Sequence, residues 1–126
     1  MKIRKLSELT EREINGLHGT LDGYDDYFIS EVAANVCELW EINDGESFCI
    51  TRLERDTIKD TITLVVCAYK GKNLDQFAQH ITKIADANKW LIRVHTTKPA
   101  LVRWYTRKYN FNKPEYVLIR DNQNGK

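Results

Sequence analysis

The sequence of 126 residues lacks the features that define several classes of protein. Its longest nearly unbroken apolar run, residues 64–69, is far shorter than the roughly 20 residues that a membrane-spanning helix needs. The first 14 residues, MKIRKLSELTEREI, carry charges throughout, so we expect no secretory signal and no membrane association. Internal repeats and low-complexity tracts are also missing, which excludes solenoid and fibrous architectures.

Residues that commonly hold metals or form disulfides are scarce and poorly spaced. No C-x-x-C motif occurs, and the histidines are too far apart for a metal-ligand pattern. An odd number of cysteines in apolar surroundings predicts reduced, largely buried thiols in a cytoplasm-like compartment. The cysteines are Cys37, Cys49 and Cys67, and the histidines are His18, His80 and His95.

Net charge is close to zero, but the two signs are unevenly distributed. Residues 1–63 have a net charge of −7, whereas residues 64–126 have a net charge of +8. Such an asymmetry suggests that the C-terminal half binds something anionic. Alternatively, the two halves attract each other within the fold or across a homodimer.

Local patterns predict a single α/β domain over residues 1–121, with a mixed sheet, and a flexible tail at 122–126. We expect a strand at 2–6, a helix from an N-cap at Ser7 to about residue 16, and a second short helix at 28–34. Two runs of alternating residues flank an Asn-Asp-Gly turn, which predicts antiparallel strands at 35–42 and 46–54.

The second half of the chain alternates between strands and helices. A β-branched run at 61–69 predicts a strand covered on both faces, parallel to a strand at 90–95. Between them lies a helix capped by Asn73, with Gln76 completing a capping-box variant. A helix from Thr96 or Thr97 and a last strand at 115–120 complete the order. The apolar side of the first of these helices is expected to comprise Leu74, Phe77, Ala78, Ile81, Ile84 and Ala85.

The strand-to-helix junction YKGKNLDQF, residues 69–77, is a candidate anion site, because backbone N–H groups at a helix start attract anions. This junction is similar to the phosphate loop of the GNAT acetyltransferase superfamily, and RWYTRKYNF, residues 103–111, is similar to that family's recurring C-terminal motif. The resemblance covers about residues 35–120. It looks closest to the small divergent GNAT-like proteins of tailed bacteriophages, through Leu39-Trp40, Gly71-Lys72-Asn73-Leu74 and Thr96-Thr97-Lys98-Pro99.

The resemblance implies a GNAT-like fold, a central twisted mixed sheet flanked by helices, and an N-acyltransferase that transfers an acetyl group from acetyl-CoA to an amine acceptor. Tyr105, one residue before the position where many family members carry a general-acid tyrosine, is the candidate acid. Glu38 is the candidate base, with Glu41 and Glu54 as other candidates, because the amine must lose a proton. The protein would then be cytoplasmic, or, if it is encoded by a phage, it would be located in the host cytoplasm or the virion. The implied coenzyme A contacts are Val65, Val66, Lys70, Gly71, Lys72, Asn73 and Leu74.

Several positions depart from the family pattern. Asn73 and Asp75 stand where small residues allow close approach of the phosphates, and Asp75 adds a negative charge to the first helical turn. Thr106 occupies the position of the family's tyrosine, and Asn110 that of a glycine. The alternative is therefore a non-catalytic GNAT-fold phage protein that acts in virion assembly or binds a host protein. A nucleic-acid binder using the basic, aromatic stretch 103–111 ranks lowest.

Overall fold

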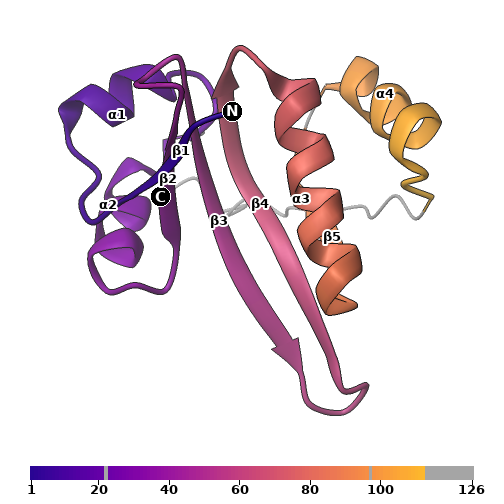
Figure 1. Ribbon diagram of the computed structural model, residues 1–126. Coiled ribbons are helices and arrows are strands. Elements are labelled where there is room, and N and C mark those ends of the chain that lie inside the picture. The colour runs from indigo at the N-terminus through magenta and orange to yellow at the C-terminus, as the bar shows by residue number, and fades with distance from the viewer. Residues whose placement is uncertain (22, 97, 113–126) are drawn as a thin grey trace, which may run out of the picture. The chain divides into compact units, whose positions relative to one another are not determined.

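A five-stranded mixed sheet organises the protein (Figure 1). The computed structural model describes residues 1–21, 23–96 and 98–112. These residues fall into two units, Met1–His95 and a second that begins at Thr96, and each is described by itself. The elements are β1 (Ile3–Leu6), α1 (Glu11–Gly16), α2 (Asp25–Ala33), β2 (Glu38–Ile42), β3 (Ser47–Asp56), β4 (Thr61–Gly71), α3 (Leu74–Asn88), β5 (Leu91–Val94) and α4 (Pro99–Tyr109).

The strands follow one another across the sheet in chain order, β1-β2-β3-β4-β5. The first four form an antiparallel meander, and β5 lies parallel to β4 after the crossover helix α3. Both sheet predictions, the antiparallel hairpin and the parallel pair, are therefore confirmed. The β2–β3 turn uses three residues with positive φ, Asn43, Asp44 and Gly45, which are residue types that tolerate this conformation.

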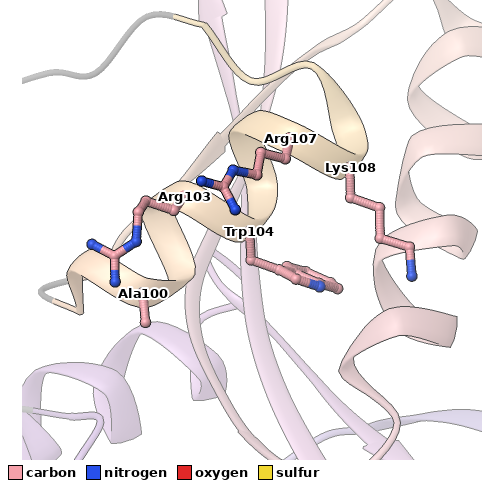
Figure 2. Close-up of a pocket in the computed structure, with 5 residues that line it drawn as sticks. All are labelled: Ala100, Arg103, Trp104, Arg107 and Lys108. Atoms are coloured by element: carbon pink, nitrogen blue, oxygen red, sulfur yellow. The ribbon is translucent and has the colours of Figure 1, made fainter.

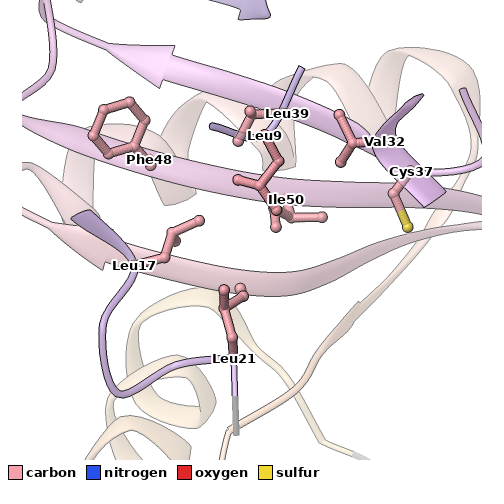
Figure 3. Packing of buried hydrophobic residues seen from close by; sticks show 9 residues of the cluster. Leu9, Leu17, Leu21, Val32, Cys37, Leu39, Phe48 and Ile50 are labelled. Atoms are coloured by element: carbon pink, nitrogen blue, oxygen red, sulfur yellow. The ribbon is translucent and has the colours of Figure 1, made fainter. Parts of the chain in front are cut away.

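Each face of the sheet packs against different helices, so the first unit has two apolar clusters. On one face, Val32 of α2 and the leucines beside α1 pack with Leu39 and Ile50, as Figure 3 shows; these leucines are Leu9, Leu17 and Leu21. On the other face, Phe77 and Ile81 of α3 cover Ile42 and further strand residues. The two faces are called below the α2 face and the α3 face. The alternation expected along β2 is confirmed, because Leu39 faces α2 and Trp40 faces α3.

Three helix starts differ from the expectation. Helix α4 begins at Pro99 with Lys98 as its N-cap, not at Thr96 or Thr97. The N-cap of α1 is Thr10, not Ser7, and the backbone N–H of Thr10 donates to the carboxylate of Glu13 at 3.0 Å. Of Ser7 and Thr10, only Thr10 is followed three residues later by an acid, as a capping box requires. The prediction of Ser7 as the N-cap is therefore wrong. Helix α2 begins at Asp25, three residues earlier than expected, with Asp25 and Asp26 in its first turn, where carboxylates interact favourably with the helix dipole.

The remaining expectations about packing are mostly confirmed. Cys37 and Cys49 are buried, Cys67 is half-buried, and all three thiols are free. In α3, Phe77, Ala78, Ile81 and Ala85 are buried as expected, whereas Ile84 is 37% exposed and lies outside the core. In the described part of the chain, no helix is long and apolar enough to cross a membrane. The strand expected at 115–120 and the tail at 122–126 lie outside the described residues, and the single domain stays a prediction.

Candidate active site

Strand β4 contains a β-bulge in its middle. Opposite β3, Ala68 pairs with Ile50 and Val66 pairs with Thr51, so Cys67 between them has no partner on β3. Cys67 and Ala68 consequently both pack on the α2 face, whereas Val66 and Tyr69 pack on the α3 face. Bulges of this kind redirect side chains and backbone groups and are frequent next to active sites.

One edge of β4 loses its partner at the bulge. The pairing with β5 ends at Val66 and Val94, followed by one hydrogen bond from the His95 N–H to the Val66 carbonyl at 3.1 Å. Beyond this point, residues 68–71 still pair with β3, but no described residue pairs with the other edge of residues 67–71. Five residues of β4 therefore present an open edge, to which an extended ligand with amide groups could hydrogen-bond.

A cavity of about 280 Å³ lies beside the bulge on the α2 face. Aromatic side chains of α2 and the residue before it form one wall, and the sheet forms the other. Burial raises the pKa of the Cys67 thiol to about 11, so this thiol stays protonated near neutral pH and is a poor nucleophile. The lining residues are Tyr24, Tyr27, Phe28, Arg52, Cys67 and His95.

The open edge of β4 leads into the β4–α3 junction, which is the turn expected at 71–74. Gly71 has φ +125°, and a Cβ there would lie 2.4 Å from the Glu46 carbonyl oxygen. The Lys72 carbonyl accepts hydrogen bonds from the Ser47 hydroxyl, at 2.6 Å, and from the Tyr69 hydroxyl. Because the C=O and N–H of a trans peptide point in opposite directions, the N–H of Asn73 is directed away from these hydroxyls.

Asn73 does not form the predicted capping box. It is the N-cap of α3 by position, with a left-handed φ of 65°, but its side chain makes no cap hydrogen bond. Instead, its side-chain N–H₂ group donates to the Glu46 carboxylate at 2.9 Å. Asparagine tolerates this left-handed backbone better than most other residues do.

Charges of both signs surround this junction. Lys70 and Lys72 are exposed, as a contribution to phosphate binding requires. Glu46 binds Asn73, and Asp75 lies in the first turn of α3, so two carboxylates counteract the lysines. The junction therefore has a backbone suited to an anion, but its attraction for an anion is weaker than the two lysines alone would give.

The candidate glutamates occupy different places. Glu38 is half-buried, and the alternation along β2 puts it on the α3 face, opposite the cavity. Glu41 is buried and forms ion pairs with Arg4, at 2.9 Å, and Arg12. Glu54 binds Arg52 at 2.6 Å and Arg93 at 2.9 Å, one carboxylate oxygen to each. A catalytic role for Glu38 stays a prediction.

The predicted cofactor contacts Val65 and Val66 lie just before the open edge. Both are buried and pair with β3 and β5 at once. The open backbone begins one residue later, at Cys67. Sequence reasoning missed the bulge, Arg52 and the cavity wall at Tyr24 and Tyr27.

Tyr105 lies in α4, in the second unit, and is only 4% exposed. Its ring contacts those of Trp104, Tyr109 and Phe111, with centroids 4.9 to 6.4 Å apart. Asn110, at the position where the family has a glycine, ends this helix in a left-handed conformation with φ 60°. Its assignment as general acid stays a prediction.

A basic surface runs along α4. Figure 2 shows the Arg103 and Arg107 guanidinium groups pointing the same way, while the Lys108 ammonium lies 5.9 Å from the Trp104 ring centroid. With Ala100 these side chains line an open depression of about 530 Å³. Among the described residues, no three side chains of His, Cys, Asp or Glu lie together in a group that could hold a metal ion.

The sequence matches no protein-family model and no curated protein. The fold, however, is similar to those of solved acetyltransferase structures. A structure described as a probable acetyltransferase matches with a TM-score of 0.64 and 11% identity, over 98% of this chain and 100% of that one. A ribosomal-protein-alanine N-acetyltransferase from Brucella melitensis biovar Abortus 2308 matches with a TM-score of 0.62 and 11% identity, over 96% and 100% of the two chains.

A third match is a possible acetyltransferase from Clostridium difficile 630, with a TM-score of 0.58, 11% identity and 96% of each chain covered. At such identities the likeness concerns the fold alone. The chain therefore has the GNAT acetyltransferase fold, as expected from its motifs.

Proposed function

We propose that this protein is an N-acyltransferase that transfers an acetyl group from acetyl-CoA to an amine. The observation that carries the proposal is the continuous path from the cavity, past the bulge at Cys67 and along the open edge of β4, to the junction at Gly71 and Asn73. The amides of an extended pantetheine arm could pair with this edge, and a pyrophosphate could bind at the start of α3.

The backbone N–H groups of the junction are suited to bind the phosphates of such a ligand. The outward N–H of Asn73 and the first N–H groups of α3 have no intrahelical acceptor, so they can donate to phosphate oxygens. Lys70 and Lys72 are exposed and add long-range attraction. The predicted contacts Gly71, Asn73 and Leu74 belong to this backbone site in the proposal, whereas Val65 and Val66 contribute packing beneath the arm.

Acetyl-CoA supplies a thioester carbonyl, at which a C–N bond to the amine forms while the C–S bond breaks. Backbone N–H groups at the bulge are suited to stabilise the negative charge that develops on the carbonyl oxygen. The attacking amine must lose a proton, and His95, which lines the cavity, is the proposed base. The sulfur must gain a proton, and Tyr105 remains the proposed acid.

Coenzyme A binding, measured by isothermal titration calorimetry, tests the proposal without knowledge of the acceptor. We expect Lys72→Glu to weaken binding and Lys59→Glu to leave it unchanged, although both reverse one exposed lysine charge. Lys59 lies in the β3–β4 turn, at the other end of β4 from the junction. The difference should shrink at high salt, because exposed charges are screened over about 8–10 Å. Failure of the wild type to bind coenzyme A at millimolar concentration would overturn the proposal.

A non-catalytic binding protein is the second candidate. The carboxylates of Glu46 and Asp75 at the junction favour it, because they oppose the binding of phosphate. Asp75→Gly should therefore tighten coenzyme A binding if the site is functional. If neither the wild type nor this variant binds, the protein acts through a macromolecular partner instead, as in virion assembly or the binding of a host protein.

A further inference from the structure

The cavity on the α2 face contains a guanidinium group with spare hydrogen-bonding capacity. Arg52 donates to Glu54 at 2.6 Å, and a second contact reaches the Tyr27 hydroxyl at only 3.5 Å, the limit of a hydrogen bond. Its Nε atom is buried and has no hydrogen-bond partner among the described residues. Because burial keeps Nε away from the cavity, a ligand there would bind the terminal nitrogens, of which Nη1 has only the long contact to Tyr27.

The charge of Arg52 is also only partly neutralised. Glu54 gives one carboxylate oxygen to Arg52 and the other to Arg93, so one negative charge is divided between two guanidinium groups. The Arg52 side chain is 24% exposed, which weakens screening by water compared with a surface arginine. An anionic group in the cavity would complete the pairing, and a carboxylate matches a guanidinium in geometry.

We propose that this cavity binds an acceptor that carries a carboxylate beside its amine, namely a small apolar or aromatic amino acid. The inference rests on the proposed acetyl transfer. The carboxylate would bind Arg52, and the aromatic rings of Tyr24, Tyr27 and Phe28 would contact the apolar body. The volume of about 280 Å³ is at the small end of ligand sites, which suits one amino acid.

The same charges disfavour other classes of amine. A polyamine or a lysine side chain brings only positive charge, which Arg52 would repel, whereas a zwitterion brings its own negative group. Positive charge near the bound ammonium also lowers the pKa of the amine, and only the deprotonated amine attacks the thioester. The arrangement would therefore contribute to both selectivity and reactivity.

Paired probes with and without the carboxylate test the inference. L-phenylalanine, L-leucine and L-alanine are titrated calorimetrically against 2-phenylethylamine, 3-methylbutylamine and ethylamine, with coenzyme A present and absent. We expect at least one amino acid to bind about tenfold or more tightly than its decarboxylated analogue, as one charge-assisted hydrogen-bond pair would give. Arg52→Met should remove this preference, Arg52→Lys should restore part of it, and Arg55→Met should leave it intact. Arg55 is exposed and belongs to the same strand, so it controls for loss of charge alone.

Equal affinity within every pair, or a preference that survives Arg52→Met, would overturn the inference. Should Arg52→Met fail to fold, Arg52→Gln replaces it, because it removes the positive charge and keeps a polar side chain, and it too should remove the preference. The coenzyme A titration of the preceding section separates the two proposals. If coenzyme A binds but the carboxylate has no effect, only the acceptor class is wrong. If amino acids bind through Arg52 but coenzyme A does not, the acetyl transfer is wrong, and the anion-binding cavity stands as a binding site.

Discussion

Replacing Gly71 by alanine tests whether the β4–α3 junction has the close contacts that the proposed function uses. A Cβ at this position would lie 2.4 Å from the Glu46 carbonyl oxygen and 2.7 Å from the Ser47 Cα, both backbone atoms. Real Cβ atoms essentially never approach other atoms closer than 3.0 Å, so the backbone of the β2–β3 turn must move. The φ of +125° adds strain, because side chains rarely adopt it.

Gly23→Ala is the matched control for this variant. Gly23 also has a positive φ, +80°, but nothing lies within 4 Å of the Cβ that alanine would add. It should therefore show the conformational cost alone, about 1 kcal/mol. Gly71→Ala carries that cost and the clash, and backbone strain and overpacking each cost about 1–3 kcal/mol. We expect it to lower the free energy of unfolding by about 3 kcal/mol or more.

Urea denaturation followed by circular dichroism measures both variants, and a constant m-value shows that only stability changes. Coenzyme A titration of the folded Gly71→Ala protein then reports on the junction, where we expect at least a tenfold weaker affinity, or about 1.4 kcal/mol. If Gly71→Ala is no less stable than Gly23→Ala and binds coenzyme A normally, the close packing of the junction against the β2–β3 turn plays no part in the site.

Three further perturbations follow from the described contacts. Because burial raises the pKa of Cys67 from 9.0 to about 11, its thiolate fraction at pH 8 falls roughly 100-fold. Alkylation by iodoacetamide should be that much slower than in a peptide. It should still accelerate above about pH 10, where an ordinary thiol is already mostly ionised. Glu41→Gln weakens two ion pairs of a buried carboxylate, so urea denaturation should show a loss of about 1.5–3 kcal/mol, and an unchanged midpoint would contradict the role. Burial raises the pKa of Glu13, but hydrogen bonds from Thr10 outweigh it, and the net shift is downward from 4.5. The stability it contributes is present above pH 4.5 and lost as pH falls through the folded pKa, so Glu13→Gln should reduce the loss of stability measured on acidification.

Elements whose two sides differ could be predicted from the sequence. Helix α3 has apolar residues at helical spacing, with Phe77, Ile81 and Ala85 on one side, and these are the buried positions. Strand β2 alternates, so Leu39 and Trp40 could be assigned to opposite faces in advance. The errors at Ser7 and at the start of α2 concern helix ends, where several polar residues compete for the cap.

The bulge at Cys67 left no such pattern. An extra residue in a strand shifts every later side chain to the other face. The sequence reveals this shift only when one face is polar and the other is apolar, because the alternation of polar and apolar residues then changes phase. Residues 64–68 are all apolar because both faces of β4 are covered. The shift between Val66 and Ala68 therefore changes nothing in the hydrophobic pattern, and only the pairing with β3 reveals it.

The floor of the cavity did leave a signal in strand β3. Successive residues on its α2 face are Phe48, Ile50, Arg52 and Glu54, so one face changes from apolar to charged within a single strand. A strand that ran into solvent would give the same change, and the hairpin beyond residue 54 does run into solvent, since Arg55 and Asp56 are exposed. Only the position of α2 distinguishes the two cases, because its aromatic residues cover Arg52 and leave the end of the hairpin uncovered. Recognition of Arg52 as a ligand-binding residue thus depends on a helix that precedes β3 by two elements, and local sequence carries no record of that contact.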